Sequence, residues 1–306
     1  MKVFYDPRQS VQENDSFSPS ASKPALAVQS WSRLGIPFEI RSFSPLSMDD
    51  LALAHDRRYV EEILSCKEPN GFGNRSQTVA DSLPWVCGSM AESARCAFET
   101  GETCFSPTSG AHHAGYNFGG GFCTFNSLIM AAQMAHTAGA ETVAIVDMDC
   151  HWGNGTQDIM DRLKLGDWLR HYSFGRQSLR PASSDDLWPF YGAGPNGSDV
   201  DPSVDAWLRN LTDRMQCVMS GVDLVIFNDG VDSHADDPLG GYLTTEDMAR
   251  RDDIVLRTAF ELGIPVALAL AGGYQKEANG SINAVLRLHD TTFETAARYD
   301  RVGWSR

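Results

Sequence analysis

Three short runs of the sequence are apolar at nearly every position and rich in small or β-branched residues. They are TVAIVDM (142–148), DLVIFND (223–229) and PVALALA (265–271). Continuous apolar runs of this length are typical of strands that are covered on both faces. Residues 125–139, before the first run, and residues 244–263, before the third, carry helical patterns. This alternation predicts a parallel sheet with helices on both faces.

Polar residues gather directly after each of the three predicted strands. The segments are DMDCHWGNG (147–155), NDGVDSHADDP (228–238) and AGGYQ (271–275). In parallel sheets of this kind, ligands bind outside the carboxyl ends of the strands. We therefore expect the three segments to form one active site at the C-terminal ends of the strands.

The first segment carries Asp147, Asp149 and His151 at alternating positions. In an extended chain such residues share one face. Two carboxylates buried side by side raise one another's pKa, and a metal ion removes that penalty. Oxygen and imidazole ligands suit Zn²⁺ with a fourth position open for water. The segment alone does not decide between a metal site and acids that cap loop amides beside a packed histidine.

Two adjacent histidines, His112 and His113, lie in the glycine-rich segment SGAHHAGYNFGGGFC (109–123). Imidazoles titrate near neutral pH, so a neighbouring pair suits proton transfer in catalysis. Taken alone, the segment is explained more simply as a histidine-rich surface turn.

The other two segments add further groups. Four carboxylates surround His234 in the acidic loop: Asp229, Asp232, Asp236 and Asp237. One of them could be a third metal ligand, and the others would be solvated or would cap helices. Tyr274 could donate to a developing oxyanion, although a packing tyrosine is the alternative. Together the segments predict metal-assisted hydrolysis of a carbonyl compound.

The composition limits the classes of protein that fit. The chain has 306 residues, of which 42% are hydrophobic, enough to bury the core of a single domain spanning residues 1–306. The net charge of −15 argues against binding of nucleic acid. Seven cysteines without a Cys-x-x-Cys pair are typical of reduced thiols, and no signal peptide or membrane span is evident. We therefore expect a cytoplasmic enzyme with no membrane partner.

Three loop-rich stretches, residues 9–24, 68–79 and 176–202, interrupt the alternating pattern. Loops of this length in a compact domain tend to be functional. We expect them to form surface rims on the same domain.

Five motifs make the chain resemble a known family. GAHHA, GGGFCTFN, DMDCHWGNGTQD, GVDSHADDPLGG and AGGY occur in that order between residues 109 and 274. The chain resembles the histone deacetylase family of the arginase/deacetylase superfamily, and especially its bacterial branch, which includes the acetylpolyamine amidohydrolases. The resemblance implies an α/β fold with a central, mostly parallel sheet of about eight strands and helices on both faces.

The resemblance also implies roles for individual residues. It makes Asp149, His151 and Asp237 the ligands of one zinc ion per chain. His113 would be the general base and acid, and Tyr274 would donate to the substrate carbonyl and then to the oxyanion.

Further residues would support this centre. His112 would be the electrostatic partner of His113, with Asp147 accepting from His112 and Asn154 accepting from His113. The residues expected to line the narrow substrate tunnel are Gly121, Phe122, Phe174 and Gly272. The resemblance also implies a structural potassium ion near Asp147, Asp149 and His151, with Ser173 as a contributor.

The chain departs from the family pattern in three places. SPTSGAHHA stands where relatives carry an Arg-Pro-Pro-Gly run, and Trp152 stands where a second histidine usually follows the zinc histidine. The insertion that builds the dimer rim of known polyamine deacetylases is absent ahead of His112. The motifs therefore specify the reaction more closely than the substrate. The oligomeric state stays open, with a homodimer and a tetramer both possible.

These observations predict a zinc-dependent amidohydrolase that removes an acetyl or short acyl group from a primary amine. Its substrate would be an acetylpolyamine or an acetyl-lysine. One alternative is a dinuclear enzyme related to arginase, which needs additional bridging carboxylates and histidines. The other is a catalytically inactive protein that binds acylated amines, with Trp152 blocking the pocket.

Overall fold

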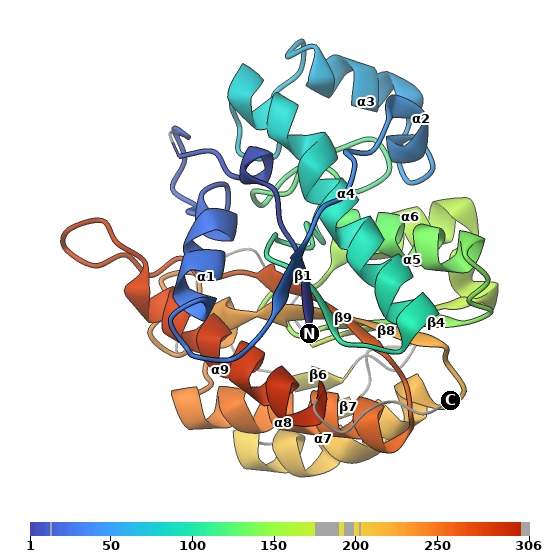
Figure 1. Cartoon of the computed structure of the whole chain (residues 1–306), viewed down its shortest axis with the longest axis vertical. Coiled ribbons are helices and arrows are strands. Elements are labelled where there is room, and N and C mark those ends of the chain that lie inside the picture. The colour runs from blue at the N-terminus through green and yellow to red at the C-terminus, as the bar shows by residue number, and fades with distance from the viewer. Residues whose placement is uncertain (13, 175–189, 193–198, 202, 301–306) are drawn as a thin grey trace.

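The computed structural model describes residues 1–306 apart from 13, 175–189, 193–198, 202 and 301–306 (Figure 1). Its centre is a seven-stranded sheet in the order β2-β1-β3-β9-β8-β4-β5. The strands are β1 (Lys2–Phe4), β2 (Glu39–Arg41), β3 (Cys104–Ser106), β4 (Val143–Asp147), β5 (Leu169–Ser173), β8 (Leu224–Gly230) and β9 (Val266–Ala271). All neighbouring strands in it are parallel. The predicted fold class is confirmed, with seven strands in the sheet where about eight were expected.

The three predicted strands are the adjacent strands β9, β8 and β4 of this sheet. Every residue of these strands is buried, as continuous apolar runs require. A separate antiparallel pair, β6 (Phe190–Gly192) and β7 (Asp199–Asp201), lies within the predicted 176–202 loop. The rest of that loop is largely outside the described residues.

Helices cover both faces of the sheet (Figure 1). One face carries α1 (Lys23–Trp31), α7 (Val204–Met219), α8 (Thr245–Glu261) and α9 (Asn283–Asp300). The other carries α3 (Arg57–Leu64), α4 (Gln77–Thr100), α5 (Ser127–Thr137) and α6 (Asn154–Leu163), with the short α2 (Met48–Leu51) beside α3. Short 3₁₀ turns are η1 (Pro7–Gln9), η2 (Leu165–Asp167) and η3 (Val231–Ser233). Each face has its own apolar core.

Local capping explains where the two predicted helices begin. The Asn126 side chain accepts from the Ile129 amide at 3.1 Å, which starts α5 at Ser127. Thr244 and Asp247 form a reciprocal capping box at the start of α8. Both helices lie within a few residues of their predicted limits.

The described part of the chain contains no helix that is both long enough and apolar enough to span a bilayer. The seven cysteines are all present as free thiols, in agreement with the interpretation of their spacing.

Strand register brings the polar segments together. Asp147 at the end of β4 is paired with Asn228 of β8, and Asn228 is paired with Ala269 of β9. The chain that follows each strand therefore leaves the sheet at the same edge.

Candidate active site

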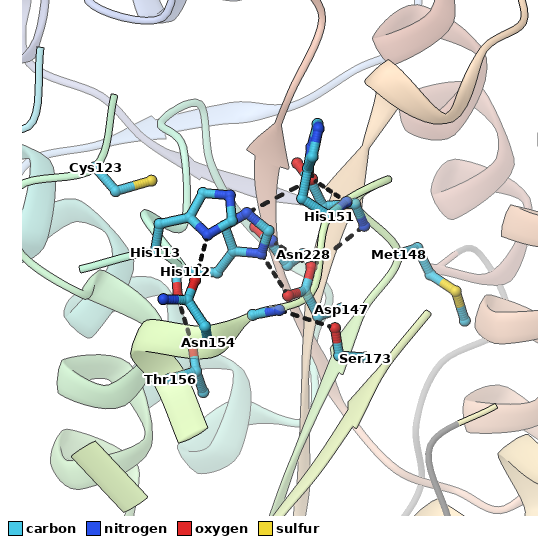
Figure 2. Close-up of polar contacts among 12 residues, drawn as sticks. His112, His113, Cys123, Asp147, Met148, His151, Asn154, Thr156, Ser173 and Asn228 are labelled. Atoms are coloured by element: carbon cyan, nitrogen blue, oxygen red, sulfur yellow. Dashed lines mark hydrogen bonds and ion pairs between the residues drawn. The ribbon is translucent and has the colours of Figure 1, made fainter. Parts of the chain in front are cut away.

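The two histidines of the glycine-rich segment lie between β3 and α5, with ring centroids 4.0 Å apart (Figure 2). His112 Nδ1 lies 2.7 Å from Asp147 Oδ2, and His113 Nδ1 lies 2.6 Å from Asn154 Oδ1. Both oxygens are acceptors, so each ring presents an Nδ1–H to its partner. The structure thus contains both hydrogen bonds that the resemblance implies.

These partners separate the two imidazoles electrostatically. Burial by itself lowers the pKa of His112, but the carboxylates of Asp147 and Asp149 raise it to about 9. Burial, followed by the charge on His112, lowers the pKa of His113 to about 3. The shifts therefore run in opposite directions: His112 favours its charged form, and His113 favours the neutral ring, which leaves its Nε2 without a proton.

Asp147 is held in place from both sides. Its Oδ1 accepts from Asn228 Nδ2 at 2.7 Å and from the Asp149 amide at 3.2 Å, while Oδ2 accepts from His112. The buried carboxylate therefore has a fixed orientation, and it fixes the His112 ring in turn.

Gly121 allows the glycine-rich loop to approach His113. Its φ is +54°, and a Cβ at this position would lie 2.5 Å from His113 Cδ2. The site therefore requires glycine here, both for the backbone conformation and for the close contact. Gly121 thus packs against the proposed base.

A group of potential metal ligands lies beside the histidine pair. Asp149, His151 and Asp232 each offer one ligand atom, and these atoms lie within 4.8 Å of one another. His151 Nδ1 is 3.1 Å from Asp149 Oδ1 and 3.0 Å from Asp232 Oδ2. All three residues are buried. Two of the three predicted zinc ligands therefore belong to this group.

The third predicted ligand, Asp237, lies next to the group rather than within it. Its oxygens accept from the amides of Tyr274 at 2.7 Å and Leu239 at 2.9 Å. Burial, followed by the charge of Asp232, raises the pKa of Asp237 to about 7. Burial and the charge of Asp149 likewise raise the pKa of Asp232. Carboxylates concentrated in this way fit a bound cation, which would offset their repulsion.

Tyr274 follows a turn in which Gly272 and Gly273 both have positive φ. The turn is anchored from α1, because Lys23 Nζ donates to the Gly272 carbonyl at 2.7 Å. Burial, followed by the nearby carboxylates, raises the pKa of Tyr274 well above 10. Its hydroxyl therefore keeps its proton. The Phe122 ring lies 5.4 Å from the Tyr274 ring, so this predicted tunnel residue is at the site.

A family model described as Histone deacetylase domain matches residues 21–165. An uncharacterized protein of Picosynechococcus is 32% identical over 68% of this chain and 71% of its own length. The chain belongs to the histone deacetylase family.

Named relatives in the family match a smaller part of their own length. Acetylpolyamine amidohydrolase 1 of Pseudomonas aeruginosa is 34% identical over 68% of this chain and 59% of its own length. Acetylpolyamine amidohydrolase of Mycoplana ramosa is 33% identical over 53% and 49%, respectively. The matched region thus spans only about half to three fifths of these relatives.

Solved structures show the same deacetylase-type fold. The HD domain of HDA15 superposes with a TM-score of 0.73 at 21% identity, covering 99% of this chain and 91% of that one. Acetylpolyamine aminohydrolase from Burkholderia pseudomallei gives 0.71 at 18% identity, covering 98% and 99%.

Three further positions named from the sequence lie around the candidate site. Phe174, expected as a tunnel wall, is 1% exposed, and its ring lies 4.4 Å from that of Trp207 in the core. Side chains alternate along β5 and its extension, and Phe174 lies on the side that packs in the core, while its role as a tunnel wall stays a prediction. Trp152, the departure after His151, has its ring 5.6 Å from that of His171. Ser173 Oγ accepts from the Gly153 amide at 3.1 Å, close to the proposed potassium site.

Three buried residues around the deacetylase site were not singled out from the sequence. Asp232 was named only as one of four carboxylates that could supply a third metal ligand. Arg251 donates to the carbonyls of Met148 and Gly230, and its helical spacing from apolar neighbours could have revealed it as buried. Lys23 has no local signal, because only the tertiary contact with Gly272 distinguishes it.

Proposed function

We propose that this protein is a zinc-dependent amidohydrolase that removes an acetyl or short acyl group from a primary amine. The carrying observation is the hydrogen bonding of His112 to Asp147 and of His113 to Asn154, next to a buried group of carboxylates and one imidazole. Relatives named acetylpolyamine amidohydrolase and histone deacetylase support the same class of reaction.

Asp149 and His151 would hold the zinc ion, with Asp237 as the third ligand and Asp232 directly behind. When bound, zinc would polarise the amide carbonyl and lower the pKa of a water molecule to about 7. A potassium ion would lie near Asp147 and Ser173, as an additional charge that stabilises the ends of β4 and β5.

Side chains of this protein would carry out the proton transfers and stabilise the oxyanion. His113 takes the proton of the attacking water at Nε2, and Asn154 keeps the ring oriented through Nδ1. The His112 cation faces the negative charge that develops in the transition state. The Tyr274 hydroxyl donates to the oxyanion, and His113 then returns its proton to the leaving amine.

The substrate would enter beside Phe122, whose ring contacts that of Tyr274. Gly121 and Gly272 would form the backbone of the same entrance. The substrate would be a small acylated amine or an acyl-lysine.

Purified protein loaded with zinc tests the proposal. It should release acetate from a panel of acetylated diamines and acetyl-lysine peptides, contain about one zinc per chain, and lose turnover in a strong chelator. Binding of acylated amines without turnover would instead support an inactive sensor. Release of urea with two Mn²⁺ per chain would support the arginase-like alternative.

A further inference from the structure

A polar cleft lies between the N-terminal loop and the chain after Tyr274, the loop that projects between β9 and α9 at the left of Figure 1. Its volume is about 240 Å³. Its lining residues are Val11, Gln12, Asn14, Ser16, Ser18, Pro19, Ala21, Ser22, Leu26, Lys276, Gly280, Ser281, Ile282, Asn283 and Leu286. Among the described residues, this lining contains one lysine and no carboxylate, although the chain has 40 acidic and 25 basic residues. Lys276 is thus the charged side chain of the described lining.

Lys276 supplies a cation that lacks a protein counter-ion. Among the described residues, no carboxylate pairs with its ammonium group, which instead lies 5.6 Å above the Phe17 ring. The neighbouring carboxylate, Glu277, is not in the lining, and it accepts from Ser281 Oγ at 2.7 Å and Asn283 Nδ2 at 3.1 Å. The lysine is therefore available to an anion that enters the cleft.

Asn14 supplies a second, independent indication. Its Oδ1 accepts from Asn74 Nδ2 at 2.8 Å, which directs the amide nitrogen away from that partner. Asn14 Nδ2 is buried and has no hydrogen-bond partner in the described part of the chain. A buried donor without an acceptor destabilises a protein unless a ligand or water satisfies it. The wall of the cleft thus contains Lys276 and a residue, Asn14, whose amide nitrogen has no partner among the described residues.

The Phe17 ring connects this cleft to the catalytic site. The ring is stacked on Tyr274 at 6.1 Å with an interplanar angle of 23°, and Ser16 and Ser18 on either side line the cleft. Phe17 is 50% exposed, so the apolar chain of a substrate can lie across it. An acylated amine at Tyr274 would then project its far end toward Lys276.

We propose that this cleft binds the carboxylate of a substrate whose acylated amine reaches Tyr274. The inference rests on the proposed amidohydrolase activity and names its substrate class: acylated ω-amino acids, including the acyl-lysine type with a free carboxylate. An acylated polyamine would instead place a second ammonium group beside Lys276, which is unfavourable. The cleft therefore selects against the substrates named for the bacterial relatives.

Three acetylated probes of similar length test this selection: 6-acetamidohexanoate, its carboxamide, and N-acetylcadaverine. The wild-type protein should have the lowest KM for the carboxylate. Lys276→Met should raise that KM roughly fivefold with little change in kcat, the size expected for an exposed ion pair. It should leave the KM of the uncharged carboxamide unchanged. Lys67→Met, an exposed lysine outside the cleft, is the matched control.

Calorimetric binding of the carboxylate and the carboxamide provides a readout that does not depend on turnover. The carboxylate should bind roughly fivefold more tightly than the carboxamide. Loss of this preference in Lys276→Met, and its weakening in Asn14→Asp, would support the cleft even if no acylated amine is hydrolysed. In that case the proposed activity alone fails. Equal affinity for the two probes, or a preference that survives Lys276→Met, overturns the cleft assignment. A peptide with acetyl-lysine at its carboxyl terminus, compared with an internal acetyl-lysine, distinguishes a free amino acid from a protein source.

Discussion

His112 and His113 are neighbours in the sequence but have opposite electrostatic environments. The acceptor for His112 is a buried carboxylate, which raises its pKa to about 9, whereas the acceptor for His113 is the neutral amide of Asn154. Burial and the adjacent cation then lower the pKa of His113 to about 3. Burial and the neighbouring charges together therefore distinguish the two imidazoles.

The Tyr274 hydroxyl gives a direct test at the scale of one residue. Tyr274→Phe removes one oxyanion donor and should reduce kcat by about 10²–10³-fold. Zinc content and the thermal unfolding midpoint should stay close to wild type, because the amide of residue 274 still donates to Asp237. Deacetylation at the wild-type rate would exclude the proposed role.

The zinc ligands can be assigned by comparing two neighbouring carboxylates. Asp237→Ala should abolish stoichiometric zinc binding, measured by elemental analysis. Asp232→Asn should retain zinc with an affinity weakened by about 10–100-fold, the usual effect of losing a residue that orients a ligand. The opposite order of effects would make Asp232 the third ligand, as its position within 4.8 Å of the group also permits.

At the scale of elements, α8 is attached to the ends of β4 and β8 through one buried side chain. Arg251 is fully buried, and it donates to the carbonyls of Met148 and Gly230 and to Asp229 Oδ1 at 2.6 Å. The helix therefore fixes the backbone from which Asp149 and Asp232 project. Apolar packing alone would not specify this orientation.

Replacement of this arginine should therefore affect stability strongly. Arg251→Met removes the arginine that pairs with the buried carboxylates of Asp229 and Asp252 and should lower the free energy of unfolding by about 3–5 kcal/mol. Urea denaturation measures the effect. Arg250→Met, on the exposed side of the same helix, is the matched control and should change stability by less than about 0.5 kcal/mol. Equal effects for the two variants would show that Arg251 does not anchor the helix.

At the scale of the whole molecule, His55 joins segments that are far apart in the sequence. Its Nδ1–H donates to the Gly115 carbonyl, and its Nε2 accepts from the Asn126 amide, each at 2.8 Å. This arrangement needs a neutral ring, because protonated Nε2 could no longer accept. Burial lowers the pKa of His55 to about 4. The unfolded chain therefore binds a proton between about pH 6.5 and pH 4 that the folded chain does not.

Stability should accordingly fall as the pH is lowered through this window and level off below about pH 4. Over this pH window, the shifted pKa of His55 should change the free energy of unfolding by about 3 kcal/mol. Urea denaturation at pH 7 and pH 4.5 should show a smaller loss for His55→Gln than for wild type, although the variant is less stable at pH 7. Identical losses in both proteins would contradict the role of the neutral ring.

Much of the architecture follows from the sequence. The continuous apolar runs at 142–148, 223–229 and 265–271 predicted buried parallel strands, and these became β4, β8 and β9. The helical periodicity of apolar residues and the capping residues are local properties of the sequence, so α5 and α8 were also predictable. Because parallel strands share one carboxyl edge, even the convergence of the polar segments could be inferred before any coordinates.

Tertiary structure decided what depends on contacts between distant segments. Asp232, one of four candidate carboxylates, joined Asp149 and His151, Phe174 packed beside Trp207 in the core, and Lys23 reached Gly272. The cleft around Lys276 likewise arises only where residues 11–26 and 276–286 meet. The sequence by itself therefore determined the fold class, three central strands, two helices and the family, because these depend on short-range periodicity and motifs. The neighbours of each charge, and with them the pKa values and the proposed substrate preference, were decided only when the chain packed.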